Sequence, residues 1–217
     1  MITRRRAFWA CRAAFLVACL LSSQFIAREP SGADLLPGRE AEIVHGLAAD
    51  IWRSRNQMAE AAGRRQLLSN AIEAKTNVDL LSRLVLGRHW RSLKPADRDE
   101  YRALFSKVVI GGLAGRLDIL LDELDGPLEQ HFAIKSSGAV GKRDVLVRSE
   151  VVAADGQSLS VDWRLRRLES GPVIIDLIVE GISLLVSQRA EFAAVVERGQ
   201  IVGLLQTLRR RAGAGGS

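Results

Sequence analysis

Apolar positions in the first half of the chain recur with a helical period. Over residues 43–58 they fall within about 100° of one helical face, the stripe expected of a helix that lies on a core: Ile43, Val44, Leu47, Ile51 and Met58. The pattern predicts a shorter helix around residues 67–72 and a third helix that carries apolar residues from 80 to 85. Asn77 or Asp79 can cap this third helix.

A long helix is predicted to begin at Pro95, with acidic residues near its positive end. Its expected inner face is formed by Tyr101, Leu104, Phe105, Val108, Val109, Leu113 and Leu117. Three glycines, Gly111, Gly112 and Gly115, interrupt this helix. Because glycine weakens a helix interior, we expect them to mark a kink or a helix end, or to leave extra room for a ligand.

After Pro127 the period changes from helix to strand. Leu159, Val161, Trp163 and Leu165 alternate with polar residues, so that this strand has one buried and one wet face. Turn signals at Asp155-Gly156 and at Ser170-Gly171-Pro172 indicate that neighbouring strands are antiparallel. Four strands are predicted, at residues 131–137, 144–153, 158–168 and 173–180, and helices return at 184–196 and 201–210. The fold class is therefore α+β, with an antiparallel sheet of about four strands and helices before and after it.

The positive charge of the chain lies largely at its N-terminus. The 217 residues include 31 Lys and Arg against 25 Asp and Glu. Residues 1–27 hold four arginines and no acid, whereas residues 28–217 hold 27 basic and 25 acidic residues. A net charge of +2 on the body gives no reason to expect a nucleic-acid partner.

Residues 1–27 are predicted to be a signal peptide that exports the protein. Arg4 to Arg6 form a positive start, and an apolar run extends from Ala13 to Leu21. The uncharged stretch from Ala13 to Ala27 is shorter than a membrane-spanning helix needs. A twin-arginine signal, lipidation at Cys19 and a retained anchor stay open as variants. Both cysteines lie in this leader, so the exported part has no thiol chemistry. We expect residues 28–36 to be a flexible start, 37–210 a single domain and 211–217 a disordered tail.

The body carries no recognisable catalytic cluster. No two of its three histidines have a metal-ligand spacing, and His45 falls on the polar side of its helix. Asp162 and Asp176 alternate with the polar positions of their strands, which predicts surface ion pairs. No phosphate-binding loop or nucleophile elbow is present. We therefore expect no catalytic residues, no metal and no cofactor.

Two stretches carry a family resemblance. One is Leu86-Gly87-Arg88-His89-Trp90, followed by Leu93-Lys94-Pro95 and the segment 99–105; the other is residues 176–184, Asp-Leu-Ile-Val-Glu-Gly-Ile-Ser-Leu, followed by Gln188-Arg189-Ala190-Glu191-Phe192. In this order and spacing, over residues 78–210, they resemble the MlaC family of periplasmic lipid carriers, also called toluene-tolerance proteins. Ser187-Gln188-Arg189, where many members have a Tyr before the Arg, is more similar to the hopanoid-associated HpnM branch. Lys94 departs from the family pattern, in which a Ser or Thr cap is commoner.

The resemblance implies a soluble periplasmic carrier that takes a phospholipid, or a hopanoid, between an inner-membrane ABC transporter complex and an outer-membrane lipoprotein complex. The lipid would occupy an apolar cavity between a curved sheet and the covering helices. Glu180 and Arg189 are expected to serve local pairing or partner contacts, and Gly181 is expected to serve backbone geometry. The expected lipid-lining residues are Tyr101, Phe105, Val109, Leu113, Val147, Val161, Trp163, Leu165, Leu177 and Val179.

Two other interpretations of the sequence remain. Cone-shaped α+β domains also host small isomerases and dehydratases, whose pockets need a carboxylate or a histidine inside. A structural adaptor would instead have a filled core and no cavity. Alternation of apolar residues predicts which face of a strand is buried, but it does not distinguish a filled core from a lined pocket.

Overall fold

The structure is a computed structural model that describes residues 38–57 and 60–214. The predicted signal peptide (1–27), the predicted flexible start (28–36) and Met58 lie outside the described residues. None of the described helices combines the length and the apolarity that a membrane-spanning segment requires.

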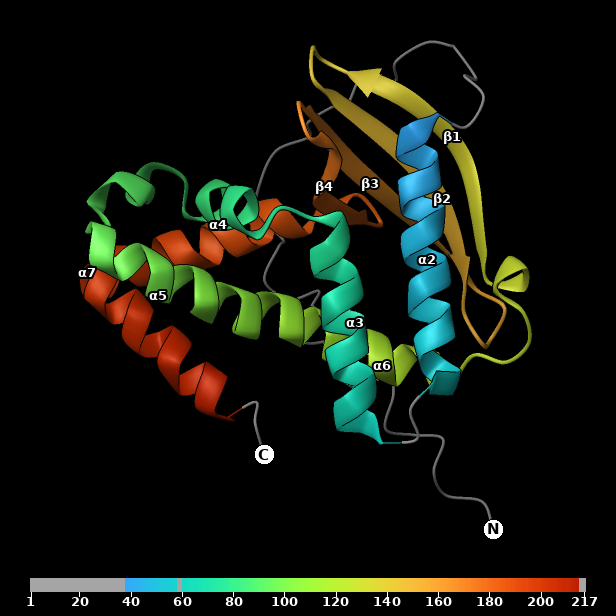
Figure 1. Cartoon of the computed structure of the whole chain (residues 1–217), viewed down its shortest axis with the longest axis horizontal. Coiled ribbons are helices and arrows are strands. Elements are labelled where there is room, and N and C mark those ends of the chain that lie inside the picture. The colour runs from blue at the N-terminus through green and yellow to red at the C-terminus, as the bar shows by residue number, and fades with distance from the viewer. Residues whose placement is uncertain (1–37, 58–59, 215–217) are drawn as a thin grey trace. The chain divides into compact units, whose positions relative to one another are not determined.

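The strands form one antiparallel meander in which each strand pairs with the next along the chain (Figure 1). The α+β class and the four predicted strands are confirmed, and a fifth strand of two residues adds to them. Gly156 adopts a φ of +80° in the predicted turn before the third strand, a conformation that glycine accommodates without strain. The strands are β1 (Phe132–Val140), β2 (Asp144–Val152), β3 (Ser158–Leu168), β4 (Gly171–Val179) and β5 (Ile182–Ser183).

The sheet has an apolar inner face and a polar outer face. Val147 pairs with Trp163, which in turn pairs with Leu177, so that these three side chains share the inner face. One position along each strand, Arg148 pairs with Asp162 on the outer face. The inner face is identified by its packing, because Val145, Val147, Leu165 and Ile174 belong to one buried cluster with Val44 and Leu47 of helix α2.

The first hydrophobic cluster joins this inner face to three helices. These are α2 (Arg39–Gln57), which lies across β1 and β2, α3 (Ala61–Lys75) and α6 (Gly111–Leu121) (Figure 1). The apolar stripe of α2 points inward as predicted: Val44 and Leu47 are fully buried, whereas His45 is exposed. A short 3-10 turn, η3 (Leu128–Gln130), leads into β1.

A second hydrophobic cluster lies among helices alone. It is built from α4 (Val78–Leu86), the 3-10 segment η1 (Gly87–Ser92), α5 (Pro95–Phe105) and α7 (Leu184–Ala214). Asn77 caps α4 by accepting a hydrogen bond from the backbone N–H of Leu80 at 2.9 Å, as the sequence predicted. Val78, the first residue of α4, packs against both clusters and so joins them.

The predicted long helix is interrupted by a π-helical turn. Residues 95–121 are helical throughout, and the turn, η2 (Ser106–Ile110), ends directly before Gly111. A Cβ added at Gly112 would meet nothing within 4 Å, and one at Gly115 would lie 3.8 Å from Arg65 Cδ. No tight contact therefore requires these two glycines, and the expected interruption of the helix is this π-helical turn.

Helix α7 contains a break at Gln200, which has φ 54° and ψ −169°. The two segments on either side correspond to the two C-terminal helices predicted at 184–196 and 201–210. The second segment continues to Ala214, four residues into the stretch expected to be a tail, and Ala212 is buried.

Asp144, at the start of β2, is an acid on which the stability of the sheet depends. Its buried carboxylate accepts hydrogen bonds from Arg166 at 2.8 and 3.0 Å and from Arg164 at 2.8 Å. The hydrogen bond from Arg166, with a smaller one from Arg164, lowers the pKa of Asp144 although burial opposes the shift. A carboxyl whose pKa is lowered in the folded state stabilises that state above its unfolded pKa of about 3.9, and this stabilisation is lost as the pH falls through the folded pKa.

We therefore expect Asp144→Asn to lower the free energy of unfolding at pH 7. In this variant the free energy of unfolding should also fall less than in the parent protein as the pH drops below about 4. Urea denaturation between neutral and acidic pH measures both effects. Glu169→Gln is the matched control, because Glu169 is exposed and its side chain forms no hydrogen bond or ion pair with the described residues. Equal acid dependence in Asp144→Asn and the parent protein would contradict this role.

Candidate functional site

An apolar strip on the inner face borders the first hydrophobic cluster. Leu177 and Val179 of β4 belong to neither cluster and are only half-buried. They pair with Trp163 and Val161 of β3, whose side chains point to the same face. We define the inner-face strip as Val161, which is buried, Trp163, which packs against the first cluster, and the half-buried Leu177 and Val179. Half-buried apolar side chains of this kind are candidate contacts for an apolar ligand.

The inner-face strip continues to the surface at β5. Ile182 pairs with Val179 and is 43% exposed, and Val186, four residues later at the start of α7, is 60% exposed. The turn between β4 and β5 places Glu180 at φ 50° and Gly181 at φ 78°. Gly181 thus adopts the left-handed conformation that glycine favours, in agreement with the backbone role predicted for it.

Polar groups beside the strip are satisfied within the sheet. Ser149 is buried, and its hydroxyl donates to the carbonyl oxygen of Val161 at 2.6 Å. Trp163 Nε1 donates to Ser149 Oγ at 2.9 Å. Because both donors are paired, the exposed surface of the strip is mainly apolar.

The other predicted lining residues lie in or against the two clusters. Val147 and Leu165 are fully buried in the first cluster, and Leu113 packs against it. Tyr101 and Phe105 are fully buried in the second cluster, and Val109 packs against it. The structure therefore does not bring the ten predicted residues together around one space.

Tyr101 shows how closely the second cluster is filled. Its ring lies 6.2 Å from Trp90, 6.1 Å from Phe105 and 6.4 Å from Phe192, measured between ring centroids. Its hydroxyl donates to the carbonyl oxygen of Ser82 at 3.0 Å, and burial raises the pKa of Tyr101. A lining role for this residue stays a prediction from the sequence.

Two aspartates do not form the surface ion pairs that the sequence predicted for them. Asp176 is buried and caps α7: its carboxylate accepts from Ser183 Oγ at 2.5 Å and from the backbone N–H of Leu185 at 2.9 Å. The expectation was wrong because α7 begins eight residues after Asp176 in the sequence. Only the turn after β4 places the start of α7 beside this carboxylate. Asp162 is half-buried and forms no salt bridge with the described residues; burial raises its pKa, and the charge of Arg148 opposes the shift.

The two motifs of the family resemblance meet in space. Arg189 of α7 donates from Nε and Nη2 to the carbonyl oxygen of Leu84, at 2.8 and 2.5 Å. Gly87, which ends α4 with a φ of +57°, would carry a Cβ 3.7 Å from Arg189 Nε. The arginine thus satisfies a carbonyl in the last turn of α4. Glu180 accepts from the backbone N–H of Ser160 at 2.5 Å, and partner contacts of Glu180 and Arg189 stay predictions.

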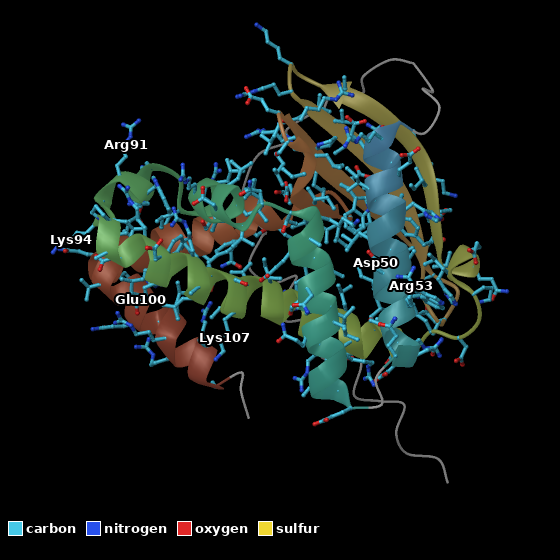
Figure 2. The ribbon with its side chains drawn as sticks, viewed as in Figure 1. Asp50, Arg53, Arg91, Lys94, Glu100 and Lys107 are labelled. Carbon is cyan, nitrogen blue, oxygen red and sulfur yellow. The ribbon has the colours of Figure 1, made fainter. Side chains whose placement is uncertain are left out.

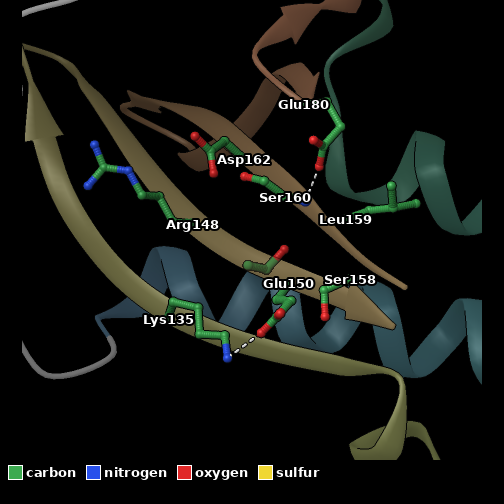
Figure 3. Close-up of a pocket in the computed structure, with 9 residues that line it drawn as sticks. Lys135, Arg148, Glu150, Ser158, Leu159, Ser160, Asp162 and Glu180 are labelled. Carbon is green, nitrogen blue, oxygen red and sulfur yellow. Dashed lines mark hydrogen bonds and ion pairs between the residues drawn. The ribbon is translucent and has the colours of Figure 1, made fainter. Parts of the chain in front are cut away.

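A hollow lies on the polar outer face of the sheet. It encloses about 470 Å³ and includes Arg148, Glu150, Asp162 and Glu180 in its lining (Figure 3). Lys135 forms an ion pair with Glu150 at one side of it. Mixed charges make this hollow unsuited to an acyl chain. The described residues contain no group of three acids or histidines that could hold a metal ion.

The fold is that of an α+β domain in which helices cover one face of an antiparallel sheet. The chain belongs to the MlaC family, whose model, described as MlaC protein, matches residues 44–210. The resemblance noted over residues 78–210 is thereby confirmed and extends towards the N-terminus. A search of curated proteins finds no match.

One solved structure with this fold is a phospholipid-binding protein from Ralstonia solanacearum in complex with a phospholipid. It is similar to this chain with a TM-score of 0.66 and 23% sequence identity. The similarity covers 81% of this chain and 96% of the Ralstonia chain. It confirms the α+β fold, with the sheet and helices in the same arrangement.

Proposed function

We propose that this protein is a periplasmic carrier that binds a phospholipid in an apolar site between its sheet and its helices. The observation that carries the proposal is the inner-face strip, in which Leu177 and Val179 are half-buried and belong to neither cluster. Membership of the MlaC family and the phospholipid bound to the Ralstonia protein support a lipid as the ligand.

An acyl chain against the strip would be stabilised chiefly by the hydrophobic effect. Each methylene moved out of water contributes roughly 0.8 kcal/mol, so several buried methylenes suffice to hold a lipid without specific polar contacts. The exposed residue Ile182, which pairs with Val179, extends the strip to the surface, where a polar head could stay in water. A site of this kind needs no catalytic group, in keeping with a carrier rather than an enzyme.

The finer part of the proposal is the transport route. The carrier would receive or deliver lipid at an inner-membrane ABC transporter complex and at an outer-membrane lipoprotein complex, with Glu180 and Arg189 near the contact. Arg189 is exposed although it is bonded to Leu84, so one face of its side chain is accessible to a partner. A hopanoid in place of a phospholipid is the variant suggested by Ser187-Gln188-Arg189.

Native mass spectrometry of the full chain, purified from a Gram-negative periplasm, tests the proposal. We expect a folded protein with about one bound lipid, and organic extraction should identify it as a phospholipid. A hopanoid in the extract would instead assign the chain to the HpnM branch. A folded protein that is empty and takes up no added phospholipid would refute the carrier and favour the structural adaptor.

A further inference from the structure

Basic residues gather where α4 ends, η1 follows and α5 begins. The twelve residues from Arg83 to Lys94 contain three arginines, one lysine and no acid. Two more arginines follow in α5, where Asp97, Asp99 and Glu100 also lie. We name this surface the basic corner and define it by Arg83, Arg88, Arg91, Lys94, Arg98 and Arg102. Since the body as a whole is almost neutral, the corner is a local excess of positive charge.

Three guanidinium groups of the basic corner surround one indole ring. Arg83, Arg98 and Arg102 place their Cζ atoms 5.0, 5.4 and 5.5 Å from the ring centroid of Trp90. Such contacts with an aromatic face stabilise cations that crowd together. Trp90 therefore holds like charges side by side in the folded protein.

Carboxylates compensate only part of this charge. Asp79 pairs with Arg83 at 2.9 Å and with Arg102 at 2.5 Å, and Asp99 pairs with Arg102 at 2.6 Å. Arg88 forms a longer pair of 3.2 Å with Glu197, in which both side chains are exposed. Glu100, on the same helix as Asp99, is already held by two hydrogen bonds from Arg209.

Three cations of the corner have no such partner. Among the described residues, the side chains of Arg91, Lys94 and Arg98 form no ion pair and no hydrogen bond, and Arg98 Nε is buried without an acceptor. Arg91 and Lys94 are exposed, and Figure 2 shows both side chains extending away from the ribbon. The corner thus offers unpaired positive charge to a large anionic surface.

We propose that the basic corner docks the protein on the surface of an anionic phospholipid bilayer. Guanidinium and ammonium groups recognise phosphate, and several of them spread over one surface suit a layer of head groups. The exposed large apolar residues of the described chain lie elsewhere: Ile119, Val140, Ile182, Val186 and Val202. Docking is therefore electrostatic and peripheral, without insertion into the bilayer.

The expected strength follows from the number of unpaired cations. A basic residue near an anionic bilayer contributes roughly a fivefold gain in affinity, so three unpaired cations give a preference on the order of 100-fold over a neutral bilayer. The preference should fall steeply as salt is raised, because surface charges more than about 8 Å apart are screened at physiological ionic strength.

Vesicle sedimentation with the full chain tests the docking. One set of vesicles is pure phosphatidylcholine and the other contains phosphatidylglycerol as well. The test variant is Arg91→Glu/Lys94→Glu, and the control is Lys142→Glu/Arg143→Glu in the turn between β1 and β2. All four residues are exposed and without ion pairs to the described part of the chain, so both variants change the net charge equally and should fold.

The parent protein and the control should prefer the anionic vesicles, and the test variant should lose at least about 25-fold in affinity for them. Equal binding to both kinds of vesicle, equal losses in the two variants, or insensitivity to salt would overturn the proposal. Failure to bind any vesicle would also overturn it and would leave an acidic protein as the partner. Lipid content measured by extraction reports on the carrier proposal separately, since the test variant should still hold its lipid.

Discussion

Leu177→Arg should reduce the lipid that co-purifies with the protein by about tenfold or more, with little loss of folding. Leu177 is half-buried on the inner-face strip, where it would contact an acyl chain. An arginine there displaces about two methylenes of the lipid, at roughly 0.8 kcal/mol each. The protein should still fold, because a long side chain at a half-buried position can extend its charged end to water.

Leu146→Arg is the matched control for this result. Leu146 is also half-buried, but it pairs with Arg164 and so points to the outer face of the same sheet. Native mass spectrometry and organic extraction of both variants give the lipid content, and circular dichroism gives the folded fraction. A normal lipid content in Leu177→Arg, or an equal loss in Leu146→Arg, would place the lipid away from the strip.

Phe105→Ala should have the largest effect on stability, about 3–5 kcal/mol in the free energy of unfolding. The ring is fully buried in the second cluster and contacts Tyr101, so its removal leaves a cavity among the helices. Urea denaturation measures the loss. Tyr101→Phe, which removes only the hydrogen bond to Ser82, should cost about 1 kcal/mol.

Val202→Ala serves as the control for this cluster, because Val202 is 61% exposed and a surface truncation changes stability by no more than about 0.5 kcal/mol. If Phe105 lined a lipid cavity instead of filling a core, its truncation would leave stability almost unchanged and would alter the bound lipid. The two measurements together therefore decide between a filled helical cluster and a lined pocket.

Periodicity predicted most of the fold because each element repeats its burial pattern. The alternation in β3 gave the correct face for Val161, Trp163 and Leu165, and the register then assigned the same face to Leu177. Strand β5 was missed because two residues are too few to show a period. The sequence indicated the π-helical turn only indirectly, through the glycine that follows it.

The site was harder to predict than the fold. Tyr101 and Leu177 are both apolar residues at inward positions, yet one is sealed in a cluster and the other is half-buried. The difference depends on which helix lies opposite each residue, and no local pattern carries that information. The contact of Arg189 with Leu84 is likewise set by the meeting of α7 with α4, from segments 105 residues apart.

The edges of the sheet also bear on how the protein behaves in solution. At one edge, β5 covers the end of β4, and Thr76 forms a parallel bridge to Ile174 farther along the same strand. At the other edge, the pairing of β1 with β2 is irregular between Ile134 and Ser136, where Lys135 lies. A capped edge, and an irregular edge that carries a charge, both disfavour the addition of a further strand. The edges of the sheet therefore resist aggregation with other copies of the chain.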